Sequence, residues 1–427
     1  MVLRRNSRTL GDVRGVVRFG PLKERPFRLL WLGRTGSAVG DSMIPVALIF
    51  SVYRINGTVT DVGIVFACYF AAGAAVTLAG GVWADRLPRR AVMIATDLIR
   101  LGTQATTAAL LFGGTMRVWE LAALQSVAGA CGGFFNPAAT ALVPQAVSAG
   151  RLQQANALLA LSRSTTNVFG PATSGAIVAS AGPGWAFAID AGSFLVSVLF
   201  VASMRVDAHV RPAASHFWSE LREGWQEVRQ HRWLTAGFLG YALGNLGVGM
   251  YIVLGSVVAK DALGGARPWG FILGAAAVGS VCGGLISYRV KPQRPVAAAF
   301  GIWALMGLPA FSLVRPFPLP TVMAAAVVFG VAVIVGNVLW ETAMQQEVRP
   351  DRLARVASFD MFLSLGLLPV GYAISGPLST ALGVATALVL AGLLMCVPNL
   401  AVLVFVREVR EVREATPLPA PAAAQVE

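Results

Sequence analysis

Charged residues are scarce in this sequence. Only 13% of its 427 residues are Asp, Glu, Lys or Arg, about half the share in an average soluble domain. By contrast, 56% of the residues are hydrophobic, and the mean hydropathy is +0.67. Too few polar side chains remain to cover a water-exposed surface, so the composition excludes an ordinary soluble protein and favours one that folds within a lipid bilayer.

Cysteine, histidine and lysine are also rare. The four cysteines lie inside apolar stretches without paired spacing, and the three histidines fall between residues 209 and 231. We therefore expect no disulfide framework, no metal site and no cofactor. No catalytic constellation of Ser, His or Cys is evident, and no lysine follows a glycine as in a nucleotide-binding loop. The sequence thus indicates neither an enzyme nor an ATP-driven pump.

The hydrophobic residues form runs of about 18 to 27 residues, each long enough to cross a hydrocarbon core as a helix. Twelve runs are predicted as spans: residues 27–53, 62–83, 92–112, 118–135, 155–179, 185–204, 234–258, 271–288, 296–314, 321–339, 359–378 and 384–406. The predicted fold is an all-α membrane protein of two six-helix bundles. Its predicted parts are a basic cytoplasmic arm (1–26), a first bundle (27–204), a central loop (205–232), a second bundle (233–406) and a cytoplasmic tail (407–427).

The two predicted bundles resemble each other in sequence. At one constant offset Gly170 pairs with Gly371, and Ser174-Gly175 pairs with Ser375-Gly376. Duplication of a six-helix unit explains these identities. Because six is an even number, both copies have the same orientation in the membrane, which places a substrate path between the bundles near the midplane.

The net charge of +13 reflects the distribution of basic residues across the membrane. Most of the 34 Lys and Arg residues fall in the arm, the tail and the loops on their side of the membrane. The loops on the other side hold only Arg54, Arg117, Lys260, Arg267 and Arg315. The positive-inside rule therefore predicts a multi-pass protein of the cell membrane with both termini in the cytoplasm, and no nucleic-acid partner.

The central loop contains an amphipathic pattern. Trp218, Leu221, Trp225 and Val228 recur at helical spacing, with charged residues on the opposite face. We expect this helix to lie along the cytoplasmic interface, and a partner-binding helix is the alternative.

Residues 81–90, GVWADRLPRR, follow the second run. They resemble the loop signature G-x-L-A-D-R-x-G-R-[RK] of the major facilitator superfamily, with Trp and Pro in two of its positions. The resemblance implies a secondary transporter with a gating motif formed by Gly81, Asp85, Arg86, Arg89 and Arg90. It also implies that the acidic residue faces the start of the eleventh helix and holds the cytoplasmic side closed.

Residues 135–175 carry the segments FNPA, ALVP, ANAL and GPATSG. They resemble the exporter branch that includes enterobactin and macrolide efflux proteins. Arg163, Gly170, Pro171 and Gly175 form the helix 5 motif, which resembles the antiporter sequence G-P-x-x-G-G, and a packing motif with no effect on direction is the alternative. Drug/proton antiporters often have an arginine where this chain has Gln125, so a proton relay based on that arginine is not expected.

Ionisable residues inside spans are costly and are candidates for function. Asp41 lies about 21 Å along the helix from Phe27, close to the midplane, and Arg34 lies two turns earlier on the same face. One interpretation is a carboxylate that faces the cavity and binds a cationic substrate or a proton. The other is a structural network of Arg34 with Asp41 that locks the first helix.

Several further residues are candidates for the substrate or proton site, namely Asp190, Glu341, Tyr69, Tyr241 and Asn245. We expect Asp190 to lie near the outer interface or gate and Glu341 near the inner end of the tenth helix. Asp97 and Arg100 in the third helix, and Arg163 in the fifth, are expected to support the cytoplasmic gate.

The sequence thus predicts a secondary transporter that exports an amphipathic or hydrophobic small molecule, such as a drug, natural product or siderophore, in exchange for protons. The expected partners are this substrate, protons and the lipid bilayer. Import of a nutrient or metabolite on the same scaffold is the nearest alternative, and a membrane sensor that does not transport is a more distant one.

Overall fold

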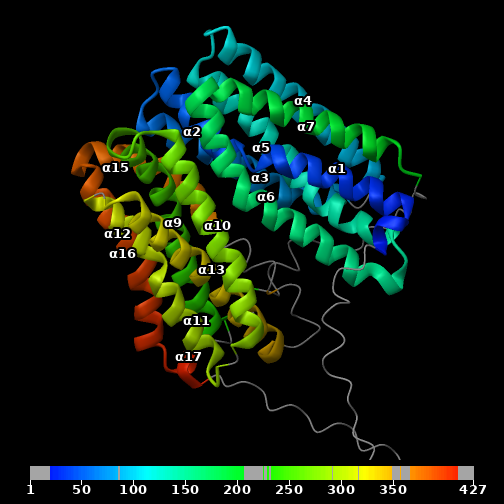
Figure 1. The fold of residues 1–427 in the computed structure, drawn as a ribbon. Coiled ribbons are helices and arrows are strands. Elements are labelled where there is room, and N and C mark those ends of the chain that lie inside the picture. The colour runs from blue at the N-terminus through cyan, green and yellow to red at the C-terminus, as the bar shows by residue number, and fades with distance from the viewer. Residues whose placement is uncertain are drawn as a thin grey trace, which may run out of the picture.

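The structure of the protein is a computed structural model that describes residues 20–84, 87–205, 225, 228–229, 232–290, 292–315, 317–348, 356 and 366–411, with the backbone alone for residues 78–84. All secondary-structure elements in these ranges are helices, which confirms the predicted fold class. They form two groups that meet at one end and diverge toward the other (Figure 1). Most of the predicted central loop, Asp85, Arg86 and the end of the tail lie outside the described residues.

The first half of the chain contains the helices α1 (Arg25–Asp41), α2 (Ile44–Arg54), α3 (Val59–Ala84), α4 (Arg89–Phe112), α5 (Val118–Ala146), α6 (Leu152–Ala181) and α7 (Pro183–Ala202). Helix α4 packs against α5 and α7, and α1 packs mainly against α7. Helices α3 and α5 lie side by side, and α2 contacts α6 and α7. Because α4 packs against both α5 and α7, one of its faces is buried and can hold polar side chains away from lipid.

The second half contains α9 (Arg232–Ala262), α10 (Ala266–Arg289), α11 (Pro295–Trp303), α12 (Leu308–Val314), α13 (Leu319–Glu347), α15 (Leu368–Leu382), α16 (Val384–Phe405) and α17 (Arg407–Glu411). A short 3-10 turn, Ala304–Gly307, joins α11 to α12 within one span. Helix α10 packs on α13, and α16 packs on α9.

Eight described segments are long and apolar enough to cross a membrane: Arg25–Arg54, Val59–Thr77, Pro183–Ala202, Arg232–Ala262, Ala266–Arg289, Pro295–Val314, Leu319–Glu347 and Val384–Phe405. Helices α4, α5, α6 and α15 account for the other four predicted spans. Helix α4 buries polar side chains along its length, and only 15 residues of α15 are described. The described helices are therefore consistent with twelve spans.

The first predicted span is interrupted directly after Asp41. Helix α1 ends there, Ser42 and Met43 form a turn, and α2 begins at Ile44. Pro45 explains the interruption, because it has no N–H to donate to the carbonyl group of Asp41 one turn earlier. The Ser174 hydroxyl of α6 donates a hydrogen bond of 2.7 Å to the Met43 carbonyl within this turn. The break therefore places Asp41 at a helix end that a neighbouring helix supports.

The two halves meet through two pairs of helices, α6 with α10 and α3 with α15. A Cβ atom on Gly270 of α10 would collide with the Pro171 carbonyl of α6, and one on Gly63 of α3 would collide with the Tyr372 carbonyl of α15. Pro171 and Tyr372 follow the glycines paired by the internal repeat. The two crossings are therefore equivalent under the duplication, which gives the repeated glycines a common role in close helix contact.

The contacts between the halves lie at the end of the molecule far from the first residues of α1 and the last of α16. At this end Tyr53 of α2 and Ser256 of α9 share a hydrogen bond of 3.0 Å between their hydroxyl groups, and Lys260 lies 4.7 Å from the Tyr53 ring centroid. In Figure 1, α2 and α15 both lie toward this end, whereas the start of α1 and α17 lie far apart. With the predicted orientation, these contacts between the halves lie on the outer side of the membrane.

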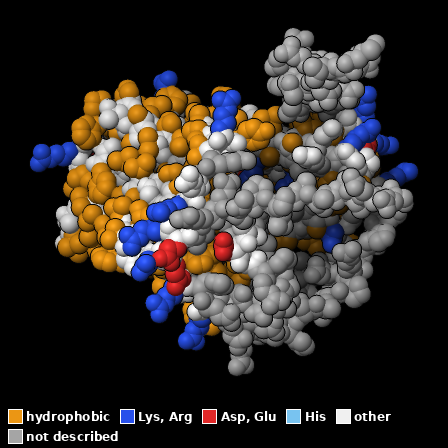
Figure 2. Space-filling view, turned by 90° about the horizontal axis from the view of Figure 1, so that it is seen from below, with side chains coloured by type: hydrophobic (Ala, Val, Ile, Leu, Met, Phe, Trp, Pro, Cys, Tyr) orange, Lys and Arg blue, Asp and Glu red, His pale blue; other side chains and the backbone are white. Residues whose placement is uncertain are grey.

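A broad area of hydrophobic side chains covers part of the surface (Figure 2), with Lys and Arg side chains mainly at its edges. Exposed large hydrophobic residues include Leu195, Leu199, Leu285, Val404 and Phe405. Such a surface suits lipid tails with basic groups near the headgroups.

The α5–α6 connection is attached to the start of α1, at the end away from the contacts between the halves. The Glu24 carboxylate accepts hydrogen bonds of 2.8 Å from the Ser148 backbone N–H and hydroxyl group, and one of 3.0 Å from Arg151. Desolvation would raise the pKa of Glu24, but these bonds and the arginine charge outweigh it and hold the pKa below its usual value.

Candidate functional site

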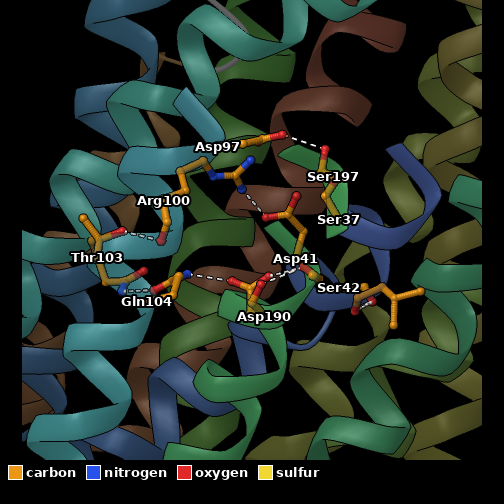
Figure 3. Close-up of polar contacts among 12 residues, drawn as sticks. Ser37, Asp41, Ser42, Asp97, Arg100, Thr103, Gln104, Asp190 and Ser197 are labelled. Atoms are coloured by element: carbon orange, nitrogen blue, oxygen red, sulfur yellow. Dashed lines mark hydrogen bonds and ion pairs between the residues drawn. The ribbon is translucent and has the colours of Figure 1, made fainter. Parts of the chain in front are cut away.

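An ion pair between Asp41 and Arg100 lies at the centre of the first half. Arg100 Nη2 of α4 donates to Asp41 Oδ1 at the end of α1 (Figure 3). The Arg100 side chain is only 6% exposed, whereas Asp41 keeps 39% of its side chain exposed. The guanidinium carbon lies 4.1 Å from the Phe194 ring centroid, which favours a buried cation. The arginine is thus held inside the bundle while the carboxylate remains accessible.

Part of the Asp41 side chain is accessible, although the residue lies deep within the first predicted span. A carboxylate at this depth of a span is not stable against lipid tails, and so its exposed surface requires a water-filled region.

Helix α4 presents a polar face to its neighbours. Among its buried residues are Thr96, Asp97, Arg100, Thr103, Gln104 and Thr107, which recur at spacings of three and four. Ser197 of α7 donates a hydrogen bond of 2.6 Å to Asp97 Oδ2. Among the described residues, Asp97 Oδ1 and Arg100 Nε have no hydrogen-bond partner. A polar face at this depth is costly in a membrane and marks a functional region.

A second buried carboxyl group, that of Asp190, contacts α4 at Gln104, one turn after Arg100. Asp190 of α7 is fully buried and accepts a hydrogen bond of 2.8 Å from Gln104. Gln104 in turn accepts one of 3.0 Å from Gln125 of α5 (Figure 3). Gln125 is thus connected to an acidic residue through one intervening amide.

One of the two interpretations of Asp41, a structural network with Arg34, was wrong. Arg34 is not the partner of Asp41, because the ion pair is made by Arg100 from another helix. Asp97 and Arg100 are buried within the first half, and their support of a cytoplasmic gate stays a prediction. The spacing of three and four residues between Asp97, Arg100 and Gln104 was the available signal, since it places all three on one face of a helix.

We expect Asp190 near the outer interface or gate; its burial excludes an exposed interface position, and a role in the outer gate stays a prediction. Asp190 is the eighth residue of α7 and has no exposed surface, since a close crossing with α1 covers it. A Cβ atom on Gly40 would collide with Asp190 Oδ1, so glycine is needed at that crossing. Tyr69 of α3, another predicted site residue, lies near enough to act electrostatically on Asp41 and Asp190.

The helix 5 motif joins this region to the other half. A Cβ atom on Gly170 would collide with Ser42 in the turn after Asp41, and one on Gly175 would lie 2.6 Å from the Ala266 carbonyl of α10. The structure therefore confirms close packing by this motif. Because the same turn of α6 touches both the break after Asp41 and the opposite half, movement of one contact affects the other.

The described arginines of the gating motif stabilise the first half internally. Arg89 donates to the Ala141 carbonyl of α5 at 2.7 Å, and Arg90 donates to the carbonyls of Val201, at 3.0 Å, and Ala202 at the end of α7. Gly81 lies in the helical backbone of α3. Asp85, Arg86 and the start of the eleventh predicted span lie outside the described residues, so the latch stays a prediction.

The remaining candidates lie in the second half. Tyr241 of α9 packs on Trp303 with ring centroids 4.9 Å apart, within a cluster of aromatic residues from α9, α11 and α13. Asn245 is buried, and Glu341 of α13 is exposed. No contact of these residues with Asp41 or Arg100 occurs among the described residues, and no group of three His, Cys, Asp or Glu there suits a metal ion.

Comparison with known proteins agrees with these features. The model of the Major Facilitator Superfamily matches residues 30–367. The MFS-type transporter YvqJ of Bacillus subtilis is 24% identical over 90% of this chain and 93% of its own length. The multidrug efflux pump Tap of Mycolicibacterium fortuitum is 26% identical over 84% and 91%, and macrolide efflux protein A of Streptococcus pyogenes is 22% identical over 87% and 94%.

A solved structure shows the same fold. The crystal structure of a bacterial homologue of the iron transporter ferroportin in the inward-facing state covers 88% of this chain and 98% of its own, at 16% identity and a TM-score of 0.69. Its helices follow the same course although few residues are shared. With the family match over most of the spans, the chain belongs to the major facilitator superfamily.

Proposed function

We propose that the protein exports an amphipathic or hydrophobic small molecule, such as a drug, natural product or siderophore, from the cytoplasm in exchange for protons. The observation that carries the proposal is the ion pair between a buried Arg100 and an accessible Asp41 at the break in the first span. The similarity to proteins named as multidrug and macrolide efflux pumps supports export of this class of compound. The chain is then a transporter of the cell membrane and not an enzyme.

The coupling follows from competition for Asp41. Arginine beside a carboxylate favours its ionised form, and separation of the pair in a dry environment favours the protonated form. The break after Asp41 is supported by Ser174 of α6, whose neighbour Gly175 contacts α10. A change in the contact between the halves therefore alters the position of Asp41 relative to Arg100, and with it the binding of a proton.

The proton gradient supplies the energy in this mechanism. The sequence has no nucleotide-binding loop, and each charge that moves through the membrane potential contributes about 2.3 kcal/mol per 100 mV. One proton per substrate at such a potential supports about a 50-fold concentration gradient, since 1.4 kcal/mol corresponds to a factor of ten.

The test is transport by an Asp41→Asn variant in inverted membrane vesicles. A growth screen of an overexpressing strain against toxic amphipathic compounds first identifies a transported compound. We expect the variant to lose accumulation driven by a pH gradient and to retain some downhill exchange. Asp261→Asn, at an exposed carboxylate of α9, is the matched control and should behave as wild type. Full proton-driven accumulation by the Asp41→Asn variant would reduce Asp41 to a structural partner of Arg100.

The same vesicles decide between export and import. Export from cells appears as uptake into inverted vesicles against an outward-directed substrate gradient when their interior is acidic. Proton-driven uptake into right-side-out vesicles alone would establish the alternative, an importer of a nutrient or metabolite.

A further inference from the structure

Two arginines inside the spans of the first half have no acidic partner among the described residues. Arg34 lies on α1 and Arg163 on α6, and neither makes an ion pair or a side-chain hydrogen bond there. They lie close enough to act on each other electrostatically, and Arg163 also acts on Asp41. Both guanidinium groups are permanently charged, because arginine does not lose its proton in proteins.

The two arginines lie on two helices that contact each other, Arg34 on α1 and Arg163 on α6. Trp31 of α1 donates a hydrogen bond of 3.0 Å from its indole N–H to the Ser162 hydroxyl of α6. Arg34 follows Trp31 by about one turn, and Arg163 is the residue after Ser162. The contact thus fixes the two backbones next to each other and places an indole ring beside the pair of charges.

This crossing carries polar side chains that are accessible in a region predicted to lie within the membrane. Arg163 is exposed, Arg34 is partly exposed, and Asn167 is exposed one turn after Arg163 on the same face of α6. Arginine in the middle of a span avoids lipid tails and faces protein or a water-filled region. Since Arg100 already neutralises Asp41, the pair adds two positive charges to this region that the nearby described residues do not balance.

We propose that Arg34 and Arg163 form a binding site for an anionic group, a carboxylate, sulfonate or phosphate, on an amphipathic substrate. Two guanidinium groups hold such an anion with charge-assisted hydrogen bonds, and the Trp31 ring offers apolar surface beside it. Asn167 provides a further donor. The proposal rests on the proposed function, because it defines which of the amphipathic compounds the space between the halves accepts.

The proposed anion site lies at the α1–α6 crossing, and Asp41 lies about two helical turns further along α1. Substrate and proton then influence each other through the charge of Arg163.

The test is equilibrium dialysis of three matched probes with the full-length protein in phosphatidylcholine nanodiscs. The probes are naphthylacetate, naphthylacetamide and naphthylethylamine, which share a ring and differ in charge. We expect the anion to bind most tightly and the cation most weakly. Arg34→Gln and Arg163→Gln should each lower the affinity for the anion about tenfold and leave the neutral amide unchanged, because a hydrogen bond to a charged group contributes about that factor.

Two further variants show whether the positive charge at this crossing is responsible for the preference. Arg163→Lys keeps the charge and should retain most of the preference for the anion, and Arg289→Gln, at an exposed end of α10, should match wild type. Equal affinity for the three probes, no detectable binding of the anion, or a preference that survives the double variant Arg34→Gln/Arg163→Gln would overturn the proposal.

Lipid headgroups carry the same chemistry as such a substrate, so the dialysis is repeated in nanodiscs with phosphatidylglycerol. Unchanged binding supports a substrate site, and competition by this lipid at the two arginines would assign the site to a headgroup and overturn the proposal. Proton-driven uptake of naphthylacetate into inverted vesicles is measured separately. Binding without such uptake counts against the proposed function and leaves the anion site in place.

Discussion

The ion pair between Asp41 and Arg100 predicts that a second substitution repairs the damage done by the first. Asp41→Asn leaves the Arg100 guanidinium, only 6% exposed, without its counter-ion. Removal of one partner from a buried pair costs about 3 to 5 kcal/mol, and the 39% exposure of Asp41 places this case near the lower end. We therefore expect Asp41→Asn to lower the free energy of unfolding by about 3 kcal/mol.

Adding Arg100→Gln removes the uncompensated charge. The double variant loses the contact of the guanidinium with the Phe194 ring, which costs about 1 to 2 kcal/mol, but no longer contains a buried cation. It should therefore be about 1 to 2 kcal/mol more stable than Asp41→Asn alone, although proton-driven transport stays absent. This order of stability distinguishes a charge pair from simple loss of packing.

The measurement is a double-mutant cycle on the free energy of unfolding, from denaturant titrations in detergent micelles followed by tryptophan fluorescence. A parallel cycle with Asp261→Asn in place of Asp41→Asn should be additive, since Asp261 is an exposed residue of the other half. If the double variant is less stable than Asp41→Asn, or if the two effects simply add, the pair does not stabilise the bundle as described.

Three other features lead to predictions. Because the folded pKa of Glu24 lies below its unfolded value, its contribution to stability is present at neutral pH and is lost as the pH falls through the folded pKa; Glu24→Gln should flatten the acid limb of the thermal stability curve. Gly175→Ala should separate α6 from α10 and lengthen the distance between spin labels on the two halves at that end, whereas Gly192→Ala, which has open space around it, should leave the distance unchanged. In a cysteine-free background, a cysteine at Gly57 should react with an impermeant reagent added outside intact cells and one at Pro212 should not; the opposite pattern would reverse the predicted orientation.

The membrane class, the two-half organisation and the motifs were predictable from the sequence because they depend on local composition and on spacing. A hydrophobic run long enough to span a bilayer has to do so wherever its neighbours lie. The repeated glycines were also readable, and the structure shows the physical reason for them. Gly170 and Gly371 each face a backbone or side chain of the first span in their own half, where any Cβ atom would collide.

The partner of Asp41 was not predictable in the same way. Arg34 lies on the correct face of the same helix, but their separation of seven positions corresponds to about 10 Å of rise, which exceeds the reach of a direct ion pair. Arg100 is distant from Asp41 in the sequence. It comes within reach only because α4 and α1 both pack against α7. Periodicity shows which face of a helix is buried and does not show which helix covers it.

The sequence by itself thus determined a polytopic helical protein, its duplication and the presence of costly charges within the spans. Only the tertiary structure decided that Arg100 neutralises Asp41, that Asp190 is buried with Gln104, and that Arg34 and Arg163 are left without an acidic partner among the described residues. The physical reason is that an ion pair depends on the distance between side chains of different helices. That distance is set by helix packing and by the break at Pro45, and not by the spacing of residues along one helix.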